Sequence, residues 1–261
     1  MPILTRTPIR HLNQEEFGEL AYSVMGCAFD IHRDFGRLFD EKIYKRELAH
    51  RHPGVQIEFP IEVTHGTFRK MQYLDLLVDG GAPFELKTVE ALTLRHQAQL
   101  LHYMLLAELQ HGKLVNLRKE SVEHEFVNTS VTHQDRLQFE VVDTDWNERL
   151  PGAQGFRELL SSLLCDWGTG LDVELYEEAL THFLGGAAEV LQEVKVRTAE
   201  HKLGHQRFRL AAPCVAFAVT TLPEADPRYH RHAHCVVQNT DLEAILWVNI
   251  NLKRVTLTAV T

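Results

Sequence analysis

Residues 55–92 carry the pattern that most restricts the fold of this 261-residue chain, because apolar and polar residues alternate along them. The segment is VQIEFPIEVTHGTFRKMQYLDLLVDGGAPFELKTVEAL, with turn-forming residues at His65-Gly66 and Asp79-Gly80-Gly81. A period of two residues is that of a β-strand with one buried face. The pattern predicts three antiparallel strands at about 55–64, 68–78 and 82–88.

Helical spacing of apolar residues flanks this segment on both sides. Asn13, with Glu16 three residues later, forms a capping box, and Gly36 is suited to ending the helix that follows. The spacing predicts helices at about 14–36, 39–50 and 93–110, and two further strands within 114–128. Helices and strands in this order predict an α/β fold, with a mixed central sheet flanked by helices.

Parts of the second half repeat the first half at an offset of 132–133 residues. The matching segments are GRLFDEKIYKRELAH with GTGLDVELYEEALTH, PFELKTV with VAFAVTT, and LVNL with WVNI. A common offset in three segments indicates an internal duplication. We therefore predict a first domain at 1–130, a linker at about 131–152, and a degenerate second copy of the same fold at 153–261.

The predicted hairpin places two carboxylates and an amine on one face of the sheet. Glu85 and Lys87 are two residues apart on one strand, so their side chains share a face, and the turn brings Asp75 beside them. Such a group of charges needs compensation, and oxygen ligands of this kind suit Mg²⁺ or Mn²⁺. We predict a metal site formed by Asp75, Glu85 and the backbone carbonyl of Leu86.

This arrangement predicts hydrolysis of phosphodiester bonds, because a divalent cation activates water and neutralises the charge that develops on phosphate. Lys87 would orient or deprotonate the attacking water. Glu41, on the second predicted helix, could add a metal ligand or hold a water at the metal. Gln99, one turn before Tyr103 on the third, could steady that water and the scissile phosphate. The expected catalytic residues are Glu41, Asp75, Glu85, Lys87 and Gln99.

Each of these residues also has an ordinary structural explanation, since exposed strands often alternate glutamate with lysine and helix glutamates are commonly solvated. Their joint placement on elements that can converge favours a site. A second candidate cluster is rich in histidine and consists of His230, His232, His234 and Cys235. It lacks a clear fourth ligand at zinc-binding spacing, so solvated histidines are favoured over a zinc site.

Residues ~14–128 resemble the GxxExxY family, a branch of the PD-(D/E)XK nuclease superfamily. The resemblance is carried by VMGCAFDIHRDFGRLFDEKIY, YLDLLVDGGAPFELKTVEAL, HQAQLLHYML, and LVNL followed by VEHEFVN. Glu41 and Tyr44 match the Glu and Tyr of the naming motif. The motif glycine is replaced by Leu38, while Gly36 matches a preceding family glycine, which implies an altered turn beside an intact metal site.

The resemblance also assigns roles to the strand and helix residues. Asp75 matches the first acidic residue of the superfamily, and Glu85 with Lys87 matches its E-x-K motif. Gln99 and Tyr103 match the Q-x-x-x-Y helix of its RecB-like members, in which Tyr103, like Tyr44, would support the site.

Site and resemblance together predict a Mg²⁺- or Mn²⁺-dependent nuclease, with DNA favoured over RNA, in bacterial repair, defence or nucleic-acid processing. The formal net charge of -9 is unusual for a protein that binds nucleic acid tightly, because binding depends on neutralising phosphates. The alternative is therefore a module without catalysis, which binds nucleic acid or another protein and uses the nuclease fold as a scaffold.

The second copy is expected to be catalytically empty. Val173, Ala218 and Thr220 lie opposite the site residues Glu41, Glu85 and Lys87, and Phe208 or Arg209 lies opposite Asp75. The copy would shape substrate, bind a protein partner or stabilise the chain.

The cysteine content and the hydropathy of the chain indicate where in the cell the protein is expected. Four scattered cysteines form no CxxC pair, and no apolar run reaches membrane-spanning length. We expect a cytoplasmic protein without a membrane segment.

Overall fold

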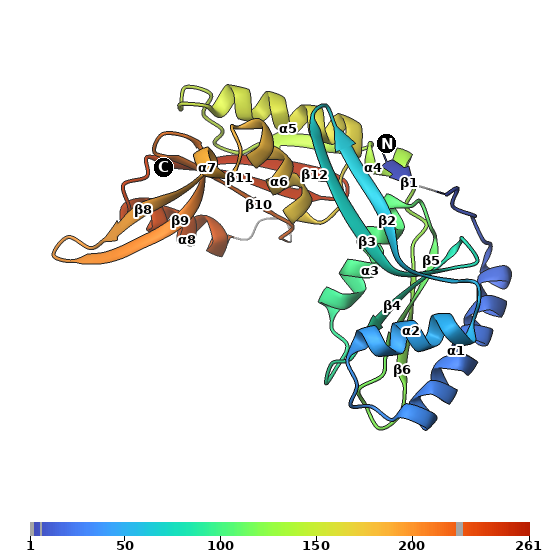
Figure 1. Ribbon diagram of the computed structural model, residues 1–261. Coiled ribbons are helices and arrows are strands. Elements are labelled where there is room, and N and C mark those ends of the chain that lie inside the picture. The colour runs from blue at the N-terminus through green and yellow to red at the C-terminus, as the bar shows by residue number, and fades with distance from the viewer. Residues whose placement is uncertain (1–2, 6, 223–226) are drawn as a thin grey trace. The chain divides into compact units, whose positions relative to one another are not determined.

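The computed structural model describes residues 3–5, 7–222 and 227–261, which form two compact units. The first unit spans Met1–His133 and the second spans Gln134–Thr261, and each contains a sheet with helices packed on it (Figure 1). The stretch predicted as a linker, about 131–152, contains α4 (His133–Arg136) and β7 (Glu140–Asp143), and the second unit begins within it.

The helices and strands of the first unit follow the predicted order, with β1 as an additional strand that was not predicted. They are β1 (Ile3–Thr5), α1 (Gln14–Phe35), α2 (Glu41–Arg51), β2 (Val55–His65), β3 (Phe68–Val78), β4 (Ala82–Lys87), α3 (Leu94–Leu106), β5 (His111–Asn116) and β6 (Glu123–Asn128). At the start of α1, the Asn13 side chain accepts hydrogen bonds from the backbone N–H groups of Glu15 and Glu16, as the capping box predicts.

The predicted boundary between α3 and β5 is wrong, because α3 ends at Leu106 and not near Gln110, and β5 begins at His111, before the predicted 114. Glu108 adopts φ +54, a left-handed conformation that a helix cannot continue through, and the Leu109 N–H donates to the Met104 carbonyl at 2.8 Å. The chain therefore leaves the helix early enough for β5 to start at His111.

The six strands of the first unit form a mixed sheet in the order β1-β2-β3-β4-β5-β6. Short turns join β2, β3 and β4, so these strands pair antiparallel. α3 connects β4 to β5, and a connection of this length lets the two strands run parallel, with Glu85 opposite Leu114 and Lys87 opposite Asn116.

Helices cover both faces of this sheet (Figure 1). On one face, Val24 and Ile31 of α1 and Leu48 of α2 pack against Phe84 and Leu86 of β4. Glu85 lies between the last two in sequence, so its side chain points to the opposite face, which α3 covers.

The second unit has its own set of elements. After α4 and β7 come α5 (Ala153–Trp167), α6 (Val173–Phe183), α7 (Ala187–Val190), β8 (Leu191–Arg197), β9 (Lys202–Ala212), β10 (Val215–Thr220), α8 (Pro227–Gln238), β11 (Ala244–Asn251) and β12 (Arg254–Val260). Its sheet is also mixed, in the order β7-β12-β11-β10-β9-β8.

The two units share an order of elements and a pattern of strand pairing. In the first unit α1 and α2 precede the antiparallel hairpin β2–β3 and strand β4, and in the second unit α5 and α6, followed by the short α7, precede the antiparallel hairpin β8–β9 and strand β10. In each unit a helix then leads to a parallel neighbour (β4 with β5, β10 with β11) and a final antiparallel strand. The register also corresponds, because Lys87 pairs with Asn116 in the first sheet and Thr220 pairs with Asn249 in the second.

Local contacts repeat as well. The Tyr44 hydroxyl donates to the Gly36 carbonyl at 2.7 Å, and the Tyr176 hydroxyl donates to the Gly168 carbonyl at the same distance. Gly36 ends α1 and Gly168 ends α5, both with φ near +70 and ψ near -160, a conformation that is essentially restricted to glycine.

No helix within the described part of the chain is both long enough and apolar enough to cross a membrane.

Candidate functional site

Asp75 lies where β3 and β4 separate. The pairing of these strands ends at Leu76 opposite Phe84, and Asp75 is the preceding residue of β3. Its Oδ2 atom accepts a hydrogen bond of 3.1 Å from the backbone N–H of Leu86. The carboxylate is therefore fixed by the backbone of the neighbouring strand.

Glu85 is fully buried, with 0% of its surface exposed. Its Oε1 accepts a hydrogen bond from Lys87 at 2.6 Å, whereas its Oε2 is buried without a hydrogen-bond partner. Burial, together with the nearby charge of Asp75, raises the pKa of Glu85 to about 8. A buried carboxylate with an unpaired oxygen is costly and indicates that a positively charged group belongs there.

Lys87 joins the two acidic residues. Its Nζ lies 2.6 Å from Glu85 Oε1 and 3.7 Å from Asp75 Oδ2. Burial alone would lower the pKa of Lys87, but the attraction and hydrogen bond of Glu85 outweigh it, so the pKa is raised. The ammonium form is therefore held beside both carboxylates.

Glu41 and Lys45 bring α2 into the same group of charges. The Lys45 Nζ lies 2.7 Å from Glu41 Oε1 and 2.6 Å from Asp75 Oδ1. Sequence reasoning missed Lys45, although its position four residues after Glu41 is a spacing at which helix side chains meet. We refer to these five residues, Glu41, Lys45, Asp75, Glu85 and Lys87, as the charged cluster.

Helix α3 brings Tyr103 and Gln99 to the charged cluster. Burial and the nearby charge of Glu85 raise the pKa of the Tyr103 hydroxyl, which also hydrogen-bonds with the Gln99 side chain. The helix is held over β3 by a buried hydrogen bond of 2.7 Å between His102 Nε2 and Gln72 Oε1. The five residues expected from the sequence to be catalytic thus lie on four elements, α2, β3, β4 and α3, that meet at one place.

Asn116 supports the end of β4 and is a residue that sequence reasoning did not identify. Its side chain accepts from the Val89 N–H at 3.1 Å and donates to the Val89 carbonyl at 2.8 Å. This pair of bonds closes the loop that follows Lys87. Asn249 makes the equivalent pair of bonds with the backbone of Leu222 in the second unit.

The charged cluster fits a divalent cation in its donor chemistry. Asp75 and Glu85 supply hard oxygen donors that share the ammonium of Lys87, and Glu85 Oε2 is a buried acceptor without a partner. Across the residues that the structure describes, no three His, Cys, Asp or Glu side chains are grouped so as to hold a metal by themselves. The remaining ligands would then come from backbone carbonyl, water or substrate.

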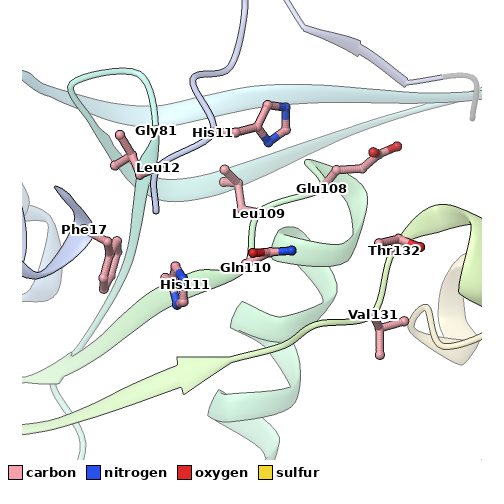
Figure 2. Close-up of a pocket in the computed structure, with 10 residues that line it drawn as sticks. All are labelled: His11, Leu12, Phe17, Gly81, Glu108, Leu109, Gln110, His111, Val131 and Thr132. Carbon is pink, nitrogen blue, oxygen red and sulfur yellow. The ribbon is translucent and has the colours of Figure 1, made fainter. Parts of the chain in front are cut away.

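A cavity of about 290 Å³ lies elsewhere in the first unit (Figure 2). It is lined by His11, Leu12, Phe17, Gly81, Glu108, Leu109, Gln110, His111, Val131 and Thr132. This lining includes no member of the charged cluster, so the cavity is separate from the candidate site.

The second unit has different side chains at the positions of the charged cluster. Val173 begins α6, as Glu41 begins α2, and Ala218 and Thr220 occupy the register positions of Glu85 and Lys87. The Trp247 indole N–H donates to Thr220 Oγ1 at 2.8 Å. In the second unit, the residue that corresponds to Lys87 therefore contacts an aromatic side chain, whereas Lys87 itself contacts two carboxylates.

The histidine-rich segment of the second unit belongs to α8 and includes His230, His232 and His234. His234 Nδ1 lies 2.8 Å from the backbone carbonyl of Thr261. Among the described residues, this segment contributes to no group of three or more His, Cys, Asp or Glu side chains that could hold a metal ion.

Comparison with curated proteins and with solved structures found no significant match. A protein-family comparison did find one, over a region that contains all five residues of the charged cluster together with Gln99 and Tyr103. Nucleases of the matched superfamily generally use divalent metal ions. Residues 18–129 of this chain match the PD-(D/E)XK nuclease superfamily.

Proposed function

We propose that the first unit is a metal-dependent nuclease that hydrolyses phosphodiester bonds in nucleic acid. The observation that carries the proposal is the buried Glu85 side chain, whose Oε1 contacts the Lys87 ammonium shared with Asp75 and whose Oε2 has no hydrogen-bond partner. Asp75, Glu85 and the Leu86 carbonyl would hold Mg²⁺ or Mn²⁺, and Glu41 is a further candidate ligand. The superfamily match supports this chemistry.

A bound divalent cation would supply Lewis acidity and offset the negative charge that develops on the phosphate. Lys87 would orient the attacking water and stabilise the charge on the pentavalent phosphorus, because its ammonium is held beside both carboxylates and donates hydrogen bonds. Gln99 would donate to the scissile phosphate, and Tyr103 would fix the Gln99 side chain through their hydrogen bond. Tyr44 would support the turn before α2 through its bond to Gly36.

We further propose that the substrate is DNA rather than RNA and that the domain belongs to the GxxExxY branch. The branch assignment is supported by Glu41 and Tyr44, which lie three residues apart at the start of α2, directly after the glycine turn at Gly36. A bacterial, cytoplasmic role in repair, defence or nucleic-acid processing is the context that we expect.

We also infer that the second unit is a degenerate copy of the first. The shared order of elements, the shared register of the parallel strand pair and the two tyrosine–glycine hydrogen bonds support a duplication. Val173, Ala218 and Thr220 offer no carboxylate or amine at the equivalent positions. We expect this copy to bind substrate or a protein partner, or to stabilise the chain, without cutting nucleic acid.

The test is Mn²⁺-dependent cleavage of single-stranded and branched DNA by the full chain, compared with the variants Asp75→Ala and Lys87→Ala. Each variant should lower the cleavage rate by at least ~100-fold, because each removes a group expected to act in the transition state. Asp30→Asn and Lys42→Met are matched controls, since both residues are exposed on the surface of the same unit.

Metal-dependent cleavage that remains in Asp75→Ala would contradict the proposal that the second unit has no catalytic activity. If the wild-type protein cuts neither DNA nor RNA with Mn²⁺ or Mg²⁺, the nuclease proposal is wrong. Binding of nucleic acid without cleavage would then support the scaffold alternative.

A further inference from the structure

The charged cluster contains two ammonium groups. Lys87 belongs to the sequence motif of the proposed nuclease site, whereas Lys45 is a second cation supplied by α2. Lys45 is only 8% exposed, and its Nζ contacts carboxylate oxygens of both Glu41 and Asp75 at 2.6–2.7 Å. A lysine placed in this way is a built-in counter-ion for the acidic side chains.

The two oxygens of Asp75 are held by different kinds of partner. Oδ2 accepts from the Leu86 backbone N–H, which the β-sheet fixes in place. Oδ1 is held by the Lys45 ammonium, which sits at the end of a flexible four-carbon side chain. An incoming cation can therefore gain access to Asp75 most easily by displacing Lys45 from Oδ1.

The charge balance leads to the same conclusion. When Glu85 is ionised, as a metal ligand must be, three carboxylates and two ammonium groups leave the charged cluster with one net negative charge. Without the Lys45 charge the cluster would carry two, which matches a divalent cation. Lys45 thus lowers the electrostatic attraction that draws a divalent cation to the site.

We propose that Lys45 is a resident counter-ion that competes with the divalent metal for Asp75 and Glu41, so that metal binding displaces its ammonium. The inference rests on the proposed metal site of the nuclease. It assigns Lys45 a positioning role: the ammonium holds the carboxylates together without metal and weakens metal affinity.

The first experiment measures the Kd for Mn²⁺ from the electron paramagnetic resonance signal of free Mn²⁺, using full-length protein first stripped with a chelator. Lys45→Met, which removes the charge and keeps the length of the side chain, should bind Mn²⁺ at least ~10-fold more tightly than wild type. Lys113→Met is the matched control, because Lys113 is also buried in the first unit but lies over the Phe126 ring. The Kd of Lys113→Met for Mn²⁺ should stay within ~2-fold of the wild-type value.

The second experiment needs no variant and so remains decisive if Lys45→Met does not fold. Wild-type protein is treated with an amine-reactive reagent with and without Mg²⁺, and labelling of each lysine is measured by peptide mass spectrometry. Mg²⁺ should increase the labelling rate of Lys45 by at least ~3-fold while leaving that of Lys113 unchanged, because displacement exposes the Lys45 ammonium. Lys45→Gln offers a second neutral variant for the Mn²⁺ titration.

The outcomes separate this inference from the function on which it rests. If wild type binds Mn²⁺ in a manner that Asp75→Ala abolishes, but the neutral variants bind no more tightly or Mg²⁺ leaves the labelling of Lys45 unchanged, competition by Lys45 is refuted and the metal site stands. If neither wild type nor the Lys45 variants bind Mn²⁺, both proposals fail.

Discussion

Replacing Glu85 by glutamine should change the pH dependence of stability in the first unit. Glu85 is fully buried, and its pKa is raised to about 8 by burial and by the charge of Asp75. Glutamine has nearly the same shape and cannot ionise, so Glu85→Gln removes the effect of ionising this buried group. The buried amide adds a contribution that does not depend on pH, and the change with pH is therefore the quantity to measure.

The sign follows from proton binding. Between the ordinary pKa of 4.5 and about 8, folded protein keeps a proton on Glu85 that unfolded protein releases, so wild-type stability from this group falls as pH rises. The difference between these two pKa values changes the free energy of unfolding by at most about 5 kcal/mol, because a tenfold change in proton affinity is worth about 1.4 kcal/mol. Relative to its value at pH 4, the stability of Glu85→Gln should exceed that of wild type by about 3 kcal/mol at pH 7 and about 5 kcal/mol at pH 9.

The assay is urea unfolding of wild type and Glu85→Gln at pH 4, 7 and 9 without divalent cations. All three tryptophans, Trp146, Trp167 and Trp247, belong to the second unit, so tryptophan fluorescence directly observes that unit alone. Unfolding of the first unit is followed by hydrogen exchange of β4 and α3 peptides. A stability difference between the two proteins that stays constant from pH 4 to pH 9, or that reverses sign, would refute the reasoning.

Two other substitutions test the packing of the site and of the helix ends. Asp75→Asn keeps an oxygen for the Leu86 N–H but leaves the buried Lys45 without one of its charged partners, and should destabilise the first unit by about 3 kcal/mol in urea unfolding followed by circular dichroism. An unchanged midpoint would contradict that account. Gly36→Ala and Gly168→Ala impose similar backbone strain of about 1–3 kcal/mol. Only at Gly168 would the new Cβ lie 2.8 Å from the backbone of Arg136, so Gly168→Ala should be the more destabilising in thermal unfolding, and equal losses would count against the steric argument.

Much of the first unit could be predicted from local pattern. Alternation of polar and apolar residues gave β2, β3 and β4 within one residue at each end, and the capping box at Asn13 gave the start of α1. The end of α3 could not be predicted, because the left-handed conformation of Glu108 depends on the turn into β5 and not on helix propensity. The pairing of β7 with β12 could not be predicted either, because the two strands are more than 100 residues apart in sequence.

The sequence by itself determined which residues could share a sheet face, since the spacing of Glu85 and Lys87 and the turn after Asp75 are local properties of a hairpin. Only the tertiary structure decided what surrounds them. Packing of α2 against the sheet brings Lys45 to Asp75 and Glu41, and burial beneath α3 leaves Glu85 Oε2 without a hydrogen-bond partner. Charge balance and desolvation depend on distances between segments that are remote in the chain, and for that reason they follow from the folded arrangement and not from residue spacing.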